Sequence, residues 1–434
     1  MSHPVSFDAL DLAVAEAVEL YVSKRPKTAS WHERARAVLP GGNTRSILFT
    51  QPFPIRIETS DGCRITDVDG FSYIDYVGEY SAGIYGHSHP AIMAAVQSAL
   101  AMGINMGAHH VREVDMAEAV TRRFHLDRVR FTNSGTEANM MALALAKNYT
   151  GRSMIMPMLG GYHGGTLMFS YGASAVNAPF ETVLGFYNDV ARTKGLIAQY
   201  ADKLAAVIVE PMLGAGGSIG AAPAFLAMLR EECARYGIVF ILDEVMTSRL
   251  APGGLAEAWG LSPDLKTLGK YVGGGMSFGA FGGRAEIMDM FDPARPQSLY
   301  HAGTFNNNTL SMTAGEVGLT KVYTPHAAVA LSASGEKLKA RLNEMLMQHQ
   351  AQLQVSGIGS LMTFHPLPGE LTTPQQLAEA DPRLRRLLYL HLLDEGIYVA
   401  ERGSMALSLA LGEAEHEALV TSVERFVTRY RSLI

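Results

Sequence analysis

The stretch RFTNSGTEANMMALALAKNY, residues 130 to 149, combines a short apolar strand, a tight turn and a helix. Ser134 and Glu137 stand three residues apart at the start of the helix, which is the spacing of a capping box. The turn leaves backbone N–H groups free at the helix N-terminus, where they and the helix dipole favour a phosphate. The hydroxyls of Ser134 and Thr136 could add hydrogen bonds. A capped helix without any ligand is the alternative that this stretch alone leaves open.

Outward from this stretch, buried apolar runs are separated by helical patterns. The runs are RVRFTN, SMIMPM, AAVIVEPM and IVFILDE, and the helical stretches ANMMALALAKNY and FLAMLREECARYG stand among them. Such alternation is typical of an α/β fold with a mostly parallel central sheet. We expect this large domain to span residues 78–312.

The two ends of the chain show other patterns. Residues 7–24 have apolar side chains at helical spacing. Residues 55–77 carry Asp-Gly pairs between short alternating segments, which predicts antiparallel strands. Helical patterns dominate beyond about residue 310. We therefore expect a smaller α+β domain built from both ends, residues 1–77 and 313–434.

The composition favours a globular protein that acts on small molecules. Hydrophobic residues make up 48% of the 434 residues and charged residues 18%, with a formal net charge of −6. No dense run of Lys and Arg predicts a surface for nucleic acid or anionic lipid. Neither a membrane span nor a targeting peptide is predicted. The two cysteines, Cys63 and Cys233, have no metal-ligand spacing, so we expect a reducing cytoplasm and no metal site.

Two carboxylates and two lysines stand at positions suited to chemistry. Asp243 and Glu244 follow an apolar strand, and ligands of open α/β sheets bind outside the carboxyl ends of the strands. A carboxylate there can act as a base, ligate a metal, pair with a cationic ring nitrogen, or simply cap a helix. Lys270 precedes a glycine run where backbone can approach a ligand closely. Lys266 competes for the same role, and the local pattern does not separate the two.

The glycine-rich segment GGGMSFGAFGG, residues 273–283, has a second interpretation as a dinucleotide-binding turn. It neither follows a strand nor opens a helix, as such a turn should. We therefore interpret it as a glycine-rich loop.

Six motifs, in this order, resemble those of the class III aminotransferases. They are NSGTEA (133–138), GGYHGG (160–165), VEP (209–211), DEV (243–245), TLGK (267–270) and AGTFNNN (302–308). The resemblance spans nearly the whole chain. It implies a fold-type-I enzyme that depends on pyridoxal 5′-phosphate (PLP), with Lys270 rather than Lys266 as the residue that binds the cofactor covalently.

The resemblance also implies what each motif residue does. Asp243 pairs with the pyridine nitrogen and keeps it protonated, so that the ring can accept electrons. The other cofactor-binding residues are Ser134, Gly135 and Thr136 around the phosphate, Tyr162 and Val245 on the two ring faces, and Glu210 near Asp243. Thr304 reaches the PLP phosphate of the other subunit, which implies a homodimer with shared active sites.

Within the class, the chain resembles the β-phenylalanine aminotransferases through the segments NTRSILF, EYSAGIYGHS, DEVMTSRLAP, GTFNNN and ERG. This implies amino transfer from 3-amino-3-phenylpropanoate to 2-oxoglutarate by a ping-pong mechanism. Because arginine binds carboxylates through a planar fork, we assign Arg45 to the β-amino acid and Arg402 to the distal carboxylate of 2-oxoglutarate. Tyr80, Met246 and Phe305 are candidates for the pocket that receives the aromatic ring. Core packing or structural ion pairs are the competing interpretations.

Other functions are compatible with the same motifs. PGG at 40–42, DEVMTS and TLGKYVGGGMSFGAFGG also resemble glutamate-1-semialdehyde 2,1-aminomutases, which usually continue PGG with a VNSPVR-like run where this chain has NTRSILF. Another class III ω-aminotransferase is a further possibility. A catalytically silent PLP-binding protein is less expected, because Lys270 and Asp243 are both present.

Overall fold

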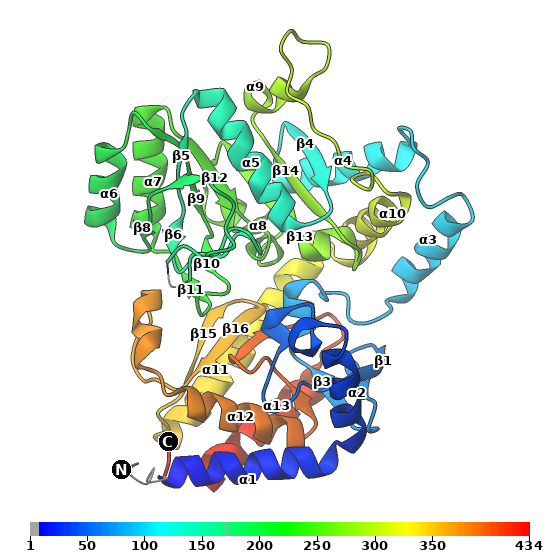
Figure 1. The fold of residues 1–434 in the computed structure, drawn as a ribbon, viewed down its shortest axis with the longest axis vertical. Helices are drawn as coiled ribbons and strands as arrows, with labels where there is room; N and C mark the ends of the chain where they lie inside the picture. The colour runs from blue at the N-terminus through cyan, green and yellow to red at the C-terminus, as the bar shows by residue number, and fades with distance from the viewer. Residues whose placement is uncertain (1–7, 171) are drawn as a thin grey trace.

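A seven-stranded sheet lies in the upper half of Figure 1, which shows a computed structural model that describes residues 8–170 and 172–434. In spatial order its strands are β4 (Arg128–Thr132), β14 (Gly279–Gly283), β13 (Leu265–Gly269), β12 (Val239–Asp243), β9 (Leu204–Val209), β5 (Met154–Met156) and β7 (Glu181–Thr182). All neighbouring pairs are parallel except those that β14 makes with β13 and β4. The expected α/β fold with a mostly parallel central sheet is confirmed.

The central strands are buried on both faces because successive side chains point to opposite sides of a sheet. In β12, Val239 and Ile241 pack in the same cluster as α5 (Gly135–Thr150). Phe240 and Leu242 pack in another cluster, with α7 (Pro223–Tyr236). This cover on two sides explains why the strands read as continuous apolar runs in the sequence.

Strand β14 lies where the sequence predicted a loop, so that interpretation is wrong for residues 279–283. A β-carbon on Gly279 would overlap the carbonyl of Ser134, and one on Gly283 would overlap the carbonyl of Asp264. Glycine is required here because neighbouring backbone approaches closely. Because glycine is depleted in strands generally, residue propensities do not predict this strand.

The two ends of the chain meet in a second group of elements, in the lower half of Figure 1. Its strands are β1 (Ile57–Asp61), β2 (Arg64–Asp67), β3 (Ser72–Asp75), β15 (Gln354–Ile358), β16 (Leu361–His365), β17 (Ile397–Tyr398) and β18 (Ser404–Ala406). They form the sheets β1-β2-β3-β17 and β15-β16-β18, and β17 pairs in parallel with β3. The domain borders at 77/78 and 312/313 remain our proposal.

The antiparallel strands expected over residues 55–77 are confirmed in β1, β2 and β3. The turns between them place Gly62 at φ 53° and Gly70 at φ 96°. Both values lie in the left-handed region that glycine adopts without a steric penalty, which is why the Asp-Gly pairs mark these turns.

Helices surround both groups of strands. Those of the lower half are α1 (Ala9–Lys24), α2 (Pro26–Arg36), α11 (Pro325–Gln348), α12 (Pro382–Asp394) and α13 (Glu413–Arg429). The remaining elements are α3 (Pro90–Leu100), α4 (Val111–Phe124), α6 (Val190–Gln199), α8 (Gly254–Ala258), α9 (Ala285–Met288), α10 (Thr309–Val317), β6 (Met158–Leu159), β8 (Gly185–Phe186), β10 (Met212–Leu213) and β11 (Ile219–Gly220). Helix α1 confirms the helix expected over 7–24, although Phe7 lies outside the described residues. Within 8–170 and 172–434, no helix is long and apolar enough to cross a membrane.

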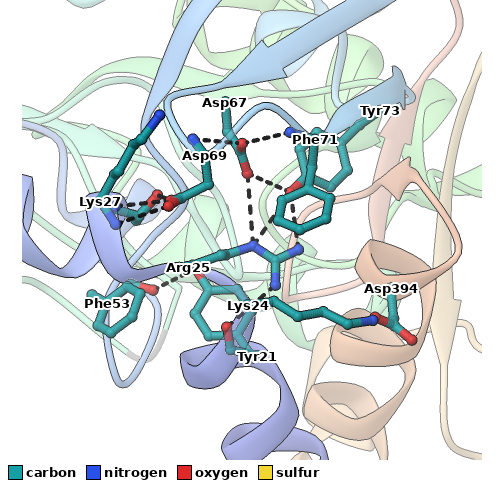
Figure 2. Close-up of polar contacts among 11 residues, drawn as sticks. Tyr21, Lys24, Arg25, Lys27, Phe53, Asp67, Asp69, Phe71, Tyr73 and Asp394 are labelled. Atoms are coloured by element: carbon teal, nitrogen blue, oxygen red, sulfur yellow. Dashed lines mark hydrogen bonds and ion pairs between the residues drawn. The ribbon is translucent and has the colours of Figure 1, made fainter.

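A buried ion pair joins the start of α2 to the sheet of β1–β3 (Figure 2). Arg25 Nε lies 3.7 Å from Asp67 Oδ2, and both side chains are almost fully buried. The Tyr73 hydroxyl donates to Asp67 Oδ2 at 2.6 Å and accepts from Arg25 Nη2 at 2.9 Å. The backbone N–H of Phe71 donates to Asp67 Oδ1 at 2.9 Å. Hydrogen bonds therefore replace much of the water that both charges lose on burial.

Asp67→Ala should lower the free energy of unfolding by about 3 to 5 kcal/mol, because Arg25 would stay buried without its counter-charge. The half-exposed bridge between Lys24 and Asp394 provides a control, since Lys24→Ala should change this quantity by less than about 1 kcal/mol. Urea unfolding followed by circular dichroism measures both. Equal losses in the two variants would contradict a structural role for the buried pair.

Candidate active site

Lys270 stands at the carboxyl end of β13, as the first residue of a 3₁₀ turn over Lys270–Gly273. Its φ of 55° is left-handed, a conformation that residues with a side chain rarely adopt. Burial lowers the pKa of Lys270 to about 8, with the nearby charges of Asp243 and Glu210 opposing the shift. Among the described residues no group accepts a hydrogen bond from its amine. The amine is therefore free to react.

Lys266 is held in place instead. Its amine donates to the carbonyl of Phe124 at 2.8 Å and lies 3.8 Å from Glu244 Oε2. Glu244 also accepts from the backbone N–H of Ala256 at 3.2 Å. The geometry thus distinguishes the two lysines. It also distinguishes the two carboxylates, because Glu244 pairs with Lys266 and Asp243 contacts Asn139 and His163.

Asp243 is oriented by three hydrogen bonds. Asn139 Nδ2 donates to Asp243 Oδ2 at 2.8 Å, and His163 Nδ1 lies 2.7 Å from the same oxygen. The backbone N–H of Val245 donates to Asp243 Oδ1 at 3.0 Å. Asn139 is itself fixed, because Thr267 Oγ1 donates to its Oδ1 at 2.6 Å. These contacts hold the carboxylate in one orientation.

His163 and Asn139 were missed by the sequence reasoning, although both lie within motifs that it used. His163 is almost fully buried, and its Nε2 atom has no hydrogen-bond partner in the described residues. Its position next to Tyr162 in GGYHGG is the only local signal. Asn139 lies one helical turn beyond Gly135 on α5, facing the sheet, where a polar side chain needs a partner.

Tyr162 and Glu210 form one unit. Glu210 accepts from the backbone N–H of Tyr162 at 2.9 Å and from that of Gly214 at 3.0 Å. Burial raises the pKa of Glu210 to about 7, and the charge of Asp243 adds to the shift while His163 opposes it. Glu210 therefore lies near Asp243, as expected, and its hydrogen bonds fix the backbone that carries the ring of Tyr162.

The start of α5 faces Val245 and the Lys270 turn. The side chain of Ser134 accepts from the backbone N–H of Glu137, but the carboxylate of Glu137 accepts from Asn133 rather than from Ser134. Only half of the expected capping box therefore forms. A β-carbon on Gly135 would come within 2.9 Å of Val245, so glycine is needed for this close approach. The first-turn N–H groups of α5 have no acceptor within the helix.

Arg45 and Arg402 lie on the same aromatic ring. The guanidinium carbon of Arg45 is 5.5 Å from the centroid of Tyr80, and that of Arg402 is 5.3 Å from it. The charges of both arginines also act on Tyr162, so these residues share one region. The structure thus brings together Lys270, Asp243, Glu210, Tyr162, Val245, Tyr80, Arg45 and Arg402.

The remaining expected residues lie elsewhere or pack differently. Met246 packs against the apolar cluster of Met212, Leu250 and Leu255, and its sulfur also lies beside Gly214, next to Glu210. Its place in a substrate pocket stays a prediction. Thr304 and Phe305 stand on an exposed loop, where the carbonyl of Thr304 accepts from Asn105 at 3.1 Å. Among the residues that the structure describes, no contact brings either of them to Lys270.

The comparisons with known proteins agree with this geometry. A family model for aminotransferase class III matches residues 49–424. A β-phenylalanine transaminase of Variovorax paradoxus is 46% identical, covering 98% of this chain and 98% of that protein. The crystal structure of a β-phenylalanine aminotransferase from that organism has a TM-score of 0.97 at 46% identity, covering 98% of this chain and 99% of the other.

Two further solved structures share the fold. An ω-transaminase from Sphaerobacter thermophilus is 36% identical with a TM-score of 0.87, covering 93% of this chain and 98% of the other. A glutamate-1-semialdehyde aminomutase from Pseudomonas aeruginosa has a TM-score of 0.88 at 23% identity, covering 96% of this chain and 98% of the other. The second similarity concerns the fold alone.

The residues present fit PLP. Lys270 supplies a buried amine without a hydrogen-bond partner in the described chain, and Asp243 supplies an oriented carboxylate for a ring nitrogen. The backbone N–H groups of Gly135 and Thr136, which have no acceptor among the described residues, suit a phosphate. The ring of Tyr162, which is 38% exposed, can lie against a planar ring.

Because the pKa of Lys270 is about 8, roughly half of its amine should be neutral at pH 8, against about 0.3% at a pKa of 10.5. Only the neutral amine attacks an aldehyde, so covalent uptake of PLP by the apoprotein should accelerate from pH 7 to 9 and then level off. Stopped-flow absorbance measures the rate, and borohydride reduction with peptide mapping identifies the lysine.

Lys270→Ala should abolish this covalent uptake, whereas Lys266→Ala should retain it. Recovery of reduced cofactor on another lysine would contradict the assignment. So would a rate that keeps rising up to pH 10.5, since it would mean that burial does not lower the pKa of the reacting amine.

Proposed function

Because the chain belongs to the class III aminotransferases and depends on PLP, we propose that it transfers the amino group of an aromatic β-amino acid such as 3-amino-3-phenylpropanoate to 2-oxoglutarate. The two half-reactions follow a ping-pong order. The main support for this choice of substrates is that Arg45 and Arg402 both lie against the ring of Tyr80. The chain is also similar over its whole length to a β-phenylalanine transaminase.

Lys270 and Asp243 do the proton chemistry in this proposal. PLP, when bound, supplies an electron sink for the carbanion left after a proton leaves the substrate carbon. Lys270 Nζ accepts that proton and returns one later, and a pKa of about 8 suits a group that must act in both directions near neutral pH. Asp243 holds a proton on the ring nitrogen, since its hydrogen bonds with Asn139, His163 and Val245 keep the carboxylate oriented.

The two arginines bind the carboxylates. Arg45 takes the carboxylate of the β-amino acid, and Arg402 takes the distal carboxylate of 2-oxoglutarate. Burial lowers the pKa of Arg402, and its Nε atom is buried without a partner in the described residues. An arginine with such an unmet donor favours an anionic ligand, because a charge-assisted hydrogen bond would offset the cost of burial.

Three other functions use the same cofactor site. An aminomutase would need a single substrate, glutamate-1-semialdehyde, and would keep the released intermediate in the site. Another ω-aminotransferase would accept amines without a β-carboxylate, and a silent PLP-binding protein would turn over nothing. The second arginine favours the aminotransferase, because two different carboxylate substrates enter in turn.

A homodimer with shared active sites is part of the proposal. Exposed apolar side chains gather on residues 100–114 and on the loop of residues 300–305, where Phe305 is 58% exposed. The two segments lie together, because Asn105 Nδ2 donates to the carbonyl of Thr304 at 3.1 Å. A patch of this kind suits a protein interface, and Thr304 within it would reach the other subunit's cofactor. The cytoplasmic location also remains a proposal, in keeping with the free thiols of Cys63 and Cys233.

The proposed activity is tested by mixing the PLP-loaded protein with 3-amino-3-phenylpropanoate, with and without 2-oxoglutarate. We expect a single turnover without the acceptor and continuous glutamate formation with it, measured by cofactor absorbance and chromatography. Turnover of glutamate-1-semialdehyde alone would indicate an aminomutase. Reaction with simple amines but not with the β-amino acid would indicate another ω-aminotransferase, and no reaction at all would indicate a silent protein.

Arg45→Ala and Arg402→Ala should each damage mainly one half-reaction. A charge-assisted contact contributes about 1.5 to 3 kcal/mol, so we expect losses of roughly 10- to 100-fold in kcat/KM for the matching substrate. Single-turnover kinetics of the two halves should therefore give opposite patterns in the two variants. Equal losses in both halves would mean that the arginines share one carboxylate or only support the structure.

A further inference from the structure

A left-handed turn runs through Gly78–Ser81 at the edge of the site. The φ values of Gly78, Glu79, Tyr80 and Ser81 are 50°, 51°, 53° and 78°. Consecutive left-handed residues that carry side chains are unusual, because the β-carbon crowds the following carbonyl. Such backbone persists only where the surrounding structure holds it, and it gathers at binding and catalytic sites.

Contacts from two sides hold this turn. Asp75 Oδ1 accepts from the backbone N–H groups of Val77 at 2.8 Å and Gly78 at 3.1 Å. Arg249 Nη1 donates to the carbonyl of Ser81 at 3.2 Å. A β-carbon on Gly78 would stand 2.5 Å from the carbonyl oxygen of Ala406, so the turn fits closely against the strand β18.

Arg249, which holds one end of this turn, is a charged residue whose burial is energetically unfavourable. Its side chain is fully buried, and none of the described carboxylates forms an ion pair with it. Besides Ser81, it donates to the carbonyl of Leu407 and, at 3.1 Å, to the hydroxyl of Ser360. A buried charge needs hydrogen-bond acceptors, and each of the three guanidinium nitrogens of Arg249 has one. It joins the turn to two segments of the C-terminal part of the chain.

The turn presents Tyr80 to both candidate carboxylate-binding arginines. The ring lies 5.5 Å from the guanidinium carbon of Arg45 and 5.3 Å from that of Arg402, within the range of cation–π attraction. Its hydroxyl donates to the carbonyl of Ile47 at 3.1 Å. That hydrogen bond fixes the 3₁₀ turn Ser46–Leu48, which directly follows Arg45.

We propose that Tyr80 is a positioning residue for carboxylate recognition, rather than part of a pocket for the aromatic ring of the substrate. This proposal rests on the proposed function. The ring of Tyr80 contacts both Arg45 and Arg402 and so fixes where each guanidinium group lies. Neither guanidinium forms an ion pair with a described carboxylate, so each keeps N–H donors for a ligand while the ring limits its movement. One side chain thereby governs binding of both the amino donor and the acceptor.

The test measures binding of two unreactive carboxylates, 3-phenylpropanoate and glutarate, to the PLP-loaded enzyme by calorimetry. Tyr80→Leu should weaken both by roughly 2- to 30-fold, the range that one lost cation–π contact gives. Tyr80→Phe keeps the ring and should restore glutarate binding, with a residual loss for 3-phenylpropanoate because the bond to Ile47 is gone. The maximal rate kcat should change little while KM rises for both substrates, since binding and not chemistry is affected.

Tyr149→Leu is the matched control. Tyr149 lies near the far end of α5, is partly exposed, and donates to Glu286 at 2.9 Å. Its loss should leave both affinities unchanged.

A double-mutant cycle separates positioning from a general structural effect. When Arg45 is already replaced by Ala, Tyr80→Leu should lower the affinity for 3-phenylpropanoate hardly any further, because Tyr80 acts through Arg45. Additive losses, or unchanged affinities in Tyr80→Leu, would overturn the proposal. An unmodified enzyme that binds neither carboxylate and does not transaminate would instead contradict the proposed function itself.

Discussion

The parallel pairing of β12 with β13 is the constraint on which the site depends. In this register Asp243 stands opposite Thr267, so the residues that follow the two strands leave the sheet at the same edge. Strand β9 pairs in parallel on the other side of β12 and ends one residue before Glu210. Strand β14 reverses direction between β13 and β4, which brings the end of β4 and the start of α5 to that edge as well. Four segments distant in sequence therefore converge through backbone hydrogen bonds alone.

The sequence predicted what depends on local pattern. Continuous apolar runs identified β5, β9 and β12, because a strand covered on both faces must be apolar throughout. Strand β4 was also predicted from its sequence, but only its last two residues, Phe131 and Thr132, are buried. The choice of Lys270 over Lys266 came only from the family resemblance. The physical difference is that the amine of Lys266 contacts Phe124 and Glu244, whereas the amine of Lys270 has no hydrogen-bond partner in the described residues. Phe124 and Glu244 are distant in the sequence from the local pattern around the two lysines.

What the sequence could not predict are features set by distant backbone. The glycines of β14 favour a loop by propensity, and only the neighbouring carbonyls of Ser134 and Asp264 explain why they form a strand. The left-handed turn at Tyr80 is likewise hidden, because three of its four residues are types that avoid that conformation. Contacts hold it, and one of them is a hydrogen bond to Ser81 from Arg249, which lies 168 residues further along the chain.

If Arg402 binds the acceptor carboxylate as we propose, its charge links that binding to the protonation of Lys270. Arg402 is among the cations that lower the pKa of Lys270, although burial is the larger cause. A carboxylate bound at Arg402 neutralises that repulsion, so Lys270 holds its proton more tightly while the anion is present. By thermodynamic reciprocity, protonated Lys270 also strengthens binding of the anion. On this proposal, the affinity for the acceptor and the basicity of Lys270 are linked by one coupling free energy.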